Sequence, residues 1–206
     1  MCNVSVKGPI SKPSSEFSFK NYITVIFEGD NTGQHYALVI DFAMSTWFTS
    51  DPHFGHANIL KHCNRPFGSI AEMDATLMAN WNSRVGPDDD IWCLGDFCWG
   101  SPDRYGSRLN GRKHLIIGNH DGQAVQTWSG WASAQPYAEL KLDDDRLVLF
   151  HYPITEWNGF YRGSLHLYGH VHGKMEPTRQ SCDAGVDVWD YRPVSLPEIR
   201  ELMSIY

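Results

Sequence analysis

Side chains of the kinds that bind transition metals occur in five clusters along this sequence. The clusters are Asp51-Pro52-His53, Gly95-Asp96, Gly118-Asn119-His120-Asp121, the single His151 and Gly169-His170-Val171-His172. Their carboxylate, amide and imidazole groups are the ligand types that hold Mn, Fe, Zn, Ni or Co in proteins. Each cluster alone is common, but their occurrence together predicts a shared metal site.

Each cluster directly follows a short apolar segment that we predict to be a β-strand. These segments are Thr46–Ser50, Ile91–Leu94, His114–Ile117, Leu147–Phe150 and Leu165–Tyr168. In an α/β protein, residues just beyond the carboxyl ends of buried strands converge on one crevice. Ligands that are far apart in the sequence can therefore meet at one point, and the pattern predicts a site for two metal ions.

A site with two metal ions needs a carboxylate that bridges them, further nitrogen or oxygen ligands on each ion, and an open edge for water and substrate. Asp96 is the natural bridge, because it is the strong anion in the middle of the set. Asp51, His53 and a further imidazole could complete one ion. Asn119, His151 and another imidazole could complete the other.

The clusters, in this order, resemble the signature of the calcineurin-like metallophosphoesterase superfamily, which reads DxH, GD, GNH[DE], H and GHxH. The resemblance extends from about Met44 to the end of the chain, and segments 51–58, 64–67 and 185–195 resemble a small bacterial and phage subgroup. It implies an α/β (α+β) fold, a four-layer α/β/β/α sandwich of two mixed sheets with helices outside. The site would then lie at the sheet edges.

The resemblance also implies a role for each residue. Two overlapping ligand sets would hold the two ions: Asp51, His53, Asp96 and His172 the first, and Asp96, Asn119, His151 and His170 the second. A hydroxide between the ions would attack phosphorus in line. His120 would stand beside the leaving group as general acid, and Asp121 would orient His120 and support its protonated form.

Three further residues are candidates for contact with the substrate. His56 either lines the substrate pocket or caps the following helix, and Arg65 either contacts a phosphate or has a surface role. Trp99 follows Asp96 closely enough to reach the substrate. Trp47, in contrast, lies in a predicted strand and is expected in the core.

The charge of the chain bears on its partners. The formal net charge is −7 and the isoelectric point is about 5.7, so the sequence lacks the general basic character of a nucleic-acid-binding protein. Two divalent ions would make the cleft locally positive, which suits a small phosphorylated substrate. We therefore expect a phosphoesterase that prefers small phosphodiesters or nucleotides. The alternatives are a phosphomonoesterase and a non-catalytic metal-binding scaffold.

The cysteine pattern and the hydropathy bear on the compartment. The chain has 5 cysteines without CxxC spacing, which indicates a reducing compartment rather than a disulfide scaffold. No apolar stretch approaches the length of a membrane span, and the beginning of the chain lacks the pattern of a secretory signal. A cytoplasmic protein without a membrane partner is expected, and the sequence leaves the oligomeric state open.

The chain is expected to consist of an extension, residues 1–43, and a metallophosphoesterase domain, residues 44–206. In the extension, 22–28 and 35–42 are strand-like and are separated by the turn-forming segment 29–33, which predicts a β-hairpin. The extension is either an added hairpin or an upstream segment that the chemistry does not need. In the domain, capping-box patterns predict helices that begin at Ser69 and Ser195.

Overall fold

The computed structural model describes residues 21–27, 36–42 and 44–206, and the chain divides into two compact units, Met1–Met44 and Ser45–Tyr206. In the first unit, β1 (Asn21–Phe27) and β2 (Tyr36–Phe42) pair in antiparallel fashion, with Asn21 opposite Phe42 and Phe27 opposite Tyr36. The predicted turn at 29–33 lies outside the described residues, as do residues 1–16.

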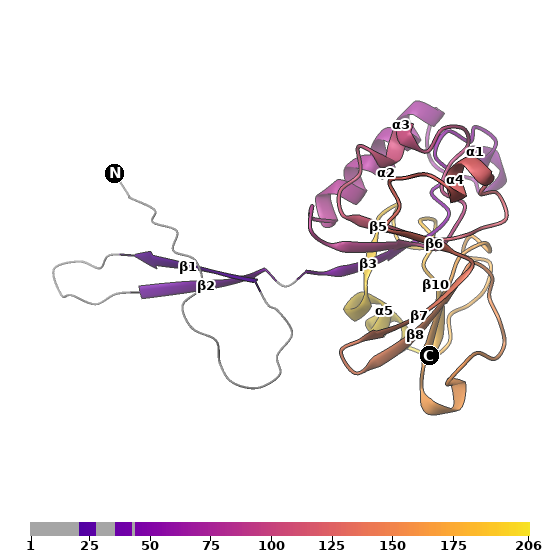
Figure 1. Cartoon of the computed structure of the whole chain (residues 1–206). Helices are drawn as coiled ribbons and strands as arrows, with labels where there is room; N and C mark the ends of the chain where they lie inside the picture. Colours follow the sequence, from indigo (N-terminus) through magenta and orange to yellow (C-terminus); the bar gives the residue numbers. More distant parts are fainter. Residues whose placement is uncertain (1–20, 28–35, 43) are drawn as a thin grey trace. The chain divides into compact units, whose positions relative to one another are not determined.

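The second unit is built on two mixed β-sheets (Figure 1). The first has the strand order β11 (Val194–Ser195), β3 (Thr46–Thr49), β4 (Asp90–Cys93), β5 (Arg112–Ile116) and β6 (Ser133–Gln135). Its strands are parallel except β11. The second has the order β10 (Ser181–Asp183), β9 (Leu165–Tyr168), β8 (Asp145–Phe150) and β7 (Tyr137–Leu142), and β7 is its antiparallel strand.

Helices cover the outer side of the five-stranded sheet. They are α1 (Ile59–His62), α2 (Ile70–Arg84), α3 (Asp103–Gly106) and α4 (Gln123–Gln126), all drawn above this sheet in Figure 1. Ile91 packs in the core beneath these helices, whereas the next residue, Trp92, packs in the core between the sheets, as the alternation of side chains in a strand requires. Helix α5 (Leu196–Met203) places Ile199 in the core between the sheets.

The outer side of the four-stranded sheet is covered differently. Here the segment between β8 and β9 contains the 3₁₀ turn η1 (Phe160–Arg162), which Gly159 and Gly163 flank with φ values of 79°. The Trp157 ring from this segment lies 5.1 Å from the His166 ring of β9. The predicted fold class of two mixed sheets with helices is therefore confirmed, and the layer on this side is a short loop and turn.

The predicted strands and helices agree closely with the structure. Helix α2 begins after Ser69, whose Oγ accepts a hydrogen bond from the Glu72 backbone N–H at 3.2 Å, as a capping box requires. The Glu72 carboxylate, however, accepts from the N–H of Gly68 and not of Ser69, at 2.8 Å. Across the described ranges 21–27, 36–42 and 44–206, none of the helices has the length and apolar character of a membrane span.

Glu198 anchors the C-terminal helix α5. Its Oε2 accepts hydrogen bonds from the backbone N–H and the hydroxyl of Ser195, at 2.9 and 2.7 Å. The Glu198 carboxylate also forms ion pairs with Arg84 of α2, through Oε2 at 2.6 Å, and with Arg192, through Oε1 at 2.8 Å. Burial alone would raise the pKa of Glu198, but the bonds from Arg192, Ser195 and Arg84 lower it to about 2. This carboxylate therefore ties the beginning of α5 to α2.

We predict that Glu198→Gln destabilises the protein at neutral pH by about 1–2 kcal/mol, because the variant loses the charge that these donors bind. Since the folded-state pKa is depressed, the contribution is complete above the ordinary pKa of 4.5 and disappears as the pH falls through about 2. Thermal unfolding at pH 7 and pH 3.5 would show that the difference in free energy of unfolding between wild type and variant is smaller at pH 3.5. Glu201→Gln, on the same helix and exposed, is the matched control. An equal difference in free energy of unfolding at both pH values would contradict the stabilising role of the ionised Glu198 carboxylate.

Candidate metal centre

The ligand clusters meet at the carboxyl ends of β3, β4, β5, β8 and β9. Backbone pairing continues past the ends of β3 and β4 and aligns the first two clusters. The N–H of Asp51 donates to the carbonyl of Gly95, and the N–H of His53 donates to that of Asp96, both at 3.0 Å. The sheet therefore delivers residues from distant parts of the sequence to one edge, as the strand-end pattern predicts.

One group of ligand atoms comes from Asp51, His53 and His172, and these atoms lie within 4.8 Å of one another. Among the described residues, the buried Asp51 Oδ1 and His53 Nε2 have no hydrogen-bond partner. His53 Nε2 lies 3.7 Å from Asp51 Oδ1 and 3.5 Å from Asp96 Oδ2. An unsatisfied buried polar atom costs about 1–3 kcal/mol. A divalent cation would satisfy both atoms, so this donor set fits a metal ion.

A second group forms around Asn119. Its Oδ1 lies 2.9 Å from His151 Nε2 and 3.0 Å from His170 Nδ1. His151 Nδ1 lies 2.7 Å from the carbonyl oxygen of Leu94, which can only accept, so Nδ1 carries the proton. In the neutral ring, the Nε2 lone pair then faces the Asn119 oxygen, which is also an acceptor. A cation between these atoms would stabilise the arrangement.

Asp96 lies between the two groups. Its Oδ2 is 3.5 Å from His53 Nε2 and 3.6 Å from His151 Nε2. Its Oδ1 accepts a hydrogen bond from the backbone N–H of His120 at 2.8 Å. One carboxylate oxygen is thus held by the backbone, and the other faces ligands from both sets. This is the position that a bridging carboxylate needs.

The backbone at the ligands adopts a conformation that non-glycine residues rarely use. The φ angles lie between 50° and 69° at five of the residues assigned as ligands: Asp51, His53, Asp96, His170 and His172. Each such residue costs of order 1–3 kcal/mol and persists only where its surroundings hold it in place. The sharp reversals turn successive side chains toward one point.

Two glycines leave room for these side chains. At Gly95, where φ is 106°, a Cβ atom would lie 2.5 Å from His151 Nδ1. At Gly169, a Cβ atom would collide with the side chains of Ser50 and Asp51. Any larger residue at either position would displace a ligand, which explains why glycine precedes these clusters.

The structure corrects the prediction for Arg65. The guanidinium is buried and donates to both carboxylate oxygens of Asp187, at 2.8 Å each. It also donates to the backbone carbonyls of Asp51, at 2.7 Å, and Pro52, at 2.9 Å, and contacts Met73 Sδ at 3.4 Å. These contacts use its N–H groups, so the predicted phosphate contact and the surface alternative are both wrong. Arg65 instead braces the loop that carries the first ligands.

Asp187 in turn orients His172. Its Oδ2 lies 2.7 Å from His172 Nδ1, which leaves His172 Nε2 to face Asp51 Oδ1 at 3.9 Å. Burial alone would raise the pKa of Asp187, but His172 and Arg65 lower it. A carboxylate behind a ligand histidine fixes the tautomer and raises the basicity of the ring. Cys63 also lies near His172 and Asp187, but both oxygens of Asp187 are already paired.

A second acidic residue supports the last cluster. Buried Asp183 accepts hydrogen bonds from the N–H groups of Gly173, at 2.8 Å, and Gly185, at 2.7 Å, and burial raises its pKa to about 6. Neither Asp183 nor Asp187 was assigned a role from the sequence. The available signal was the resemblance of segment 185–195, which marks the region without identifying the contacts.

His120 is exposed at the edge of the site. Its ring centre lies 5.7 Å from that of His53 and 6.4 Å from that of His56. His56 is half-buried and stacks on Trp99, with ring centres 5.0 Å apart and an angle of 14° between the planes. The sequence candidate His56 therefore lies beside His120, and the candidate Trp99 lies against His56.

Asp121 was expected to orient the His120 ring, but among the described residues the hydrogen bonds of its carboxylate go to the backbone. Its carboxylate is buried and accepts three backbone hydrogen bonds: Oδ1 from Phe97 at 2.8 Å, and Oδ2 from Asp96 at 2.9 Å and Gly118 at 2.8 Å. Burial raises the pKa of Asp121, although the N–H donors oppose the shift. Asp121 thus joins the loops after β4 and β5, and it acts on the site through the backbone.

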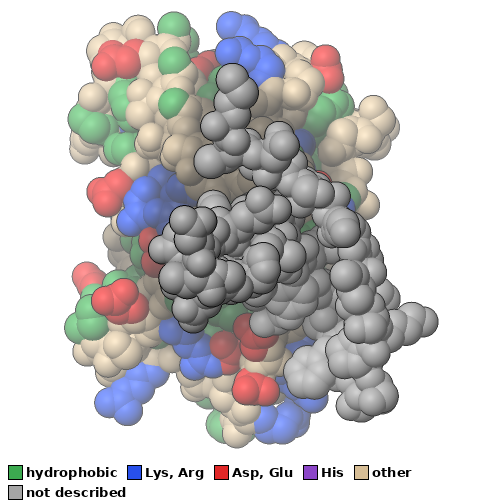
Figure 2. Space-filling model, turned by 90° about the vertical axis from the view of Figure 1, so that its left-hand side faces the viewer, with side chains coloured by type: hydrophobic (Ala, Val, Ile, Leu, Met, Phe, Trp, Pro, Cys, Tyr) green, Lys and Arg blue, Asp and Glu red, His purple; other side chains and the backbone are tan. Residues whose placement is uncertain are grey.

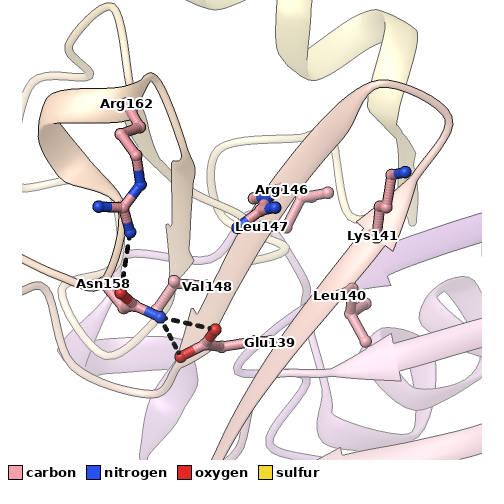
Figure 3. Close-up of a pocket in the computed structure, with 9 residues that line it drawn as sticks. Glu139, Leu140, Lys141, Arg146, Leu147, Val148, Asn158 and Arg162 are labelled. Carbon is pink, nitrogen blue, oxygen red and sulfur yellow. Dashed lines mark hydrogen bonds between the residues drawn. The ribbon is translucent and has the colours of Figure 1, made fainter.

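A separate hollow lies on the outer side of β7 and β8 (Figure 3). Its polar side chains pair with one another, since Asn158 Nδ2 donates to the Glu139 carboxylate at 2.9 and 3.1 Å and Arg162 lies 3.5 Å from Asn158 Oδ1. None of the ligand-cluster residues lines this hollow. It is therefore distinct from the metal centre.

Comparison with known proteins identifies relatives of this chain, although no protein-family model matches it. The uncharacterized protein MJ1445 of Methanocaldococcus jannaschii is 32% identical over 170 residues, which cover 77% of this chain and 90% of that protein. The gene 66 protein of Mycobacterium phage L5 is 30% identical over 197 residues, which cover 78% of this chain and 94% of the phage protein.

A solved structure also matches. The crystal structure of AQ665, a protein of unknown function from Aquifex aeolicus, superposes with a TM-score of 0.64 and 28% identity, over 78% of this chain and 100% of that one. The chain therefore belongs to the family of these archaeal and phage relatives.

We predict that Asp187→Asn weakens metal binding about 10- to 100-fold, because the amide has no charge to support His172 as a ligand. Calorimetric titration of the metal-free protein with manganese measures the metal affinity directly and needs no catalytic activity. Asp88→Asn, at an exposed position, is the control. A folded Asp187→Asn variant with wild-type affinity for manganese would rule out the orienting role.

Proposed function

We propose that this protein is a metal-dependent phosphoester hydrolase of the calcineurin-like superfamily that prefers small phosphodiesters or nucleotides. The observation that carries the proposal is the convergence of buried acceptor atoms around Asp96, with Asp51 Oδ1 and His53 Nε2 lacking hydrogen-bond partners among the described residues. Such a set of nitrogen and oxygen donors suits divalent Mn, Fe, Zn, Ni or Co. An exposed imidazole, His120, stands beside it.

The ligand atoms divide into two sets that share Asp96. The residues that would hold the ions are Asp51, His53, Asp96 and His172 for one, and Asp96, Asn119, His151 and His170 for the other. Divalent cations in such sites lower the pKa of bound water and neutralise the charge on phosphate oxygens. The protein holds its ligands in advance: His151 is fixed by the Leu94 carbonyl and His172 by Asp187.

His120 is positioned to serve as the general acid. Its backbone N–H is tied to Asp96 Oδ1 at 2.8 Å, which fixes the start of the side chain relative to the ligands. Its ring is exposed and lies near His53 and His56, so a protonated Nδ1 or Nε2 can give its proton to a departing oxygen. A positioned acid of this kind contributes about 10²–10⁴-fold to the rate.

The charge of the chain supports a small substrate. The chain has a net charge of −7, and on the face in Figure 2 the visible Lys and Arg side chains lie among Asp and Glu side chains. The visible part of this face is therefore not a continuous basic surface of the kind that follows a nucleic-acid backbone. A phosphomonoesterase and a non-catalytic metal-binding scaffold are the alternatives.

Hydrolysis of bis-p-nitrophenyl phosphate and p-nitrophenyl phosphate, by chelated protein and after manganese is restored, tests the proposal. Manganese-dependent cleavage that favours the diester supports it. Preference for the monoester would identify a phosphatase. Binding of manganese without turnover of either ester would favour the scaffold.

We predict that Asp96→Asn lowers the rate of diester hydrolysis by more than about 100-fold and reduces the amount of bound metal, because the shared carboxylate is lost from both sets. Metal content can be measured by atomic emission after gel filtration, alongside the rate. Asp88→Asn should behave as wild type. A near-normal rate with full metal content in Asp96→Asn would refute the bridging assignment.

We predict that His120→Ala retains its metal and loses rate according to the leaving group. For alkyl leaving groups, which need a proton, the loss should reach about 10²–10⁴-fold, whereas for p-nitrophenolate it should be much smaller. A series of esters with leaving groups of graded pKa gives the slope of the logarithm of the rate against the pKa of the leaving group. His62→Ala, which changes an exposed histidine at the end of α1, is the control. The same loss across the whole series would exclude proton donation by His120.

A further inference from the structure

A row of aromatic rings leads from the metal centre to an exposed tryptophan. The His172 and His53 rings stack with centres 5.4 Å apart, and His53 and His56 lie 5.5 Å apart. His56 then stacks on Trp99 at 5.0 Å. Trp99 is 60% exposed, so most of the residue remains accessible to solvent beside His56. Neither the ligand sets nor His120 accounts for this ring.

The backbone holds Trp99 in place. Its N–H donates to the carbonyl of Phe54 at 2.8 Å, and Phe54 and Cys98 form a parallel bridge. Phe54 is fully buried against Phe97 and Tyr105, with ring centres 5.5 and 4.9 Å away. Trp99 is therefore an exposed ring on a rigid support, and not the tip of a loose loop.

Exposure alone assigns no role to a single aromatic ring, so a role for Trp99 has to follow from its position in the ring row. Phe54, one residue after the ligand His53, joins the loop of the first ligands to Trp99, and the ring row separates the indole from His53 by one imidazole. The indole therefore lies two ring contacts, of 5.5 and 5.0 Å, from His53, within reach of a flat group carried by a substrate whose phosphate lies at the ligands. Stacking on an aromatic ring accepts any nucleobase, because every base has a π-face.

We propose that Trp99 is a specificity-determining residue that stacks on the nucleobase of a nucleoside phosphodiester while its phosphate lies at the metal centre. The proposal rests on the proposed function for the position of the phosphate. The recognised chemistry is a nucleobase one sugar away from a phosphate, whether in a free nucleotide or at the end of a strand.

Two esters with the same leaving group isolate the contribution of the base. Thymidine 5′-(p-nitrophenyl phosphate) and methyl p-nitrophenyl phosphate differ only in the group that remains on phosphorus. The manganese-loaded wild type should favour the thymidine ester, and Trp99→Ala should reduce the ratio of the two kcat/KM values about 10-fold, chiefly through KM. Trp99→Phe should restore most of the ratio. Tyr161→Ala, at an 83% exposed ring of η1, should leave the ratio as in wild type.

An unchanged ratio in Trp99→Ala would overturn the proposal, and so would equal losses on both esters, which indicate a general structural effect. Calorimetric titration with thymidine 5′-monophosphate separates this failure from failure of the proposed function. If wild type hydrolyses neither ester, weaker nucleotide binding by Trp99→Ala still supports stacking, and equal binding refutes it. Titration with a short single-stranded oligothymidylate identifies the source of the base, since a strand end is indicated if the oligonucleotide binds more tightly than the nucleotide.

Discussion

Crowding of acceptor atoms at one sheet edge is the constraint on which the rest of this structure depends. His151 Nε2 faces Asn119 Oδ1 at 2.9 Å, and Asp51 Oδ1 and Asp96 Oδ2 both lie within 4 Å of an imidazole nitrogen. Lone pairs brought this close repel one another unless a positive charge lies between them. The fold has to hold the atoms together before any such charge is bound, and the surrounding hydrogen bonds serve that purpose.

The carboxylates of Asp51 and Asp96 are held in the same way, each by a backbone hydrogen bond to one of its two oxygens. Asp51 Oδ2 accepts from the N–H of His170, and Asp96 Oδ1 accepts from the N–H of His120, both at 2.8 Å. Each donor belongs to another cluster, so each bond joins two loops and leaves the second carboxylate oxygen for the centre. Positive φ angles occur at both carboxylates and at the donor His170, and the hydrogen bonds offset their cost.

The sequence predicts where the five clusters meet better than it predicts the contacts of the charged residues beside them. The five clusters follow apolar strands, and strand ends in an α/β fold converge, so their meeting at one edge follows from pattern alone. Arg65 and Asp121 are different, because both lie beside ligands in the sequence and both have charges that suit a substrate or a catalyst. Only the tertiary structure shows that Arg65 pairs with Asp187, far along the chain, and that Asp121 binds backbone N–H groups. Partner choice for a buried charge depends on which donors surround it, and sequence spacing does not contain that information.

The loops that carry the ligand clusters also carry His56 and Trp99, so the proposed recognition of the substrate and the proposed metal binding would be coupled. Phe54 follows His53 and precedes His56, and Phe97 follows Asp96, and the two phenyl rings pack in the core at 5.5 Å. The paired backbones that set His53 against Asp96 continue through Phe54 to Trp99. A change in the packing of this phenyl pair would therefore move ligands and rings together. The side chains of His56 and Trp99 extend beyond this pairing, so under the proposed assignment they could alter substrate preference without moving the ligands.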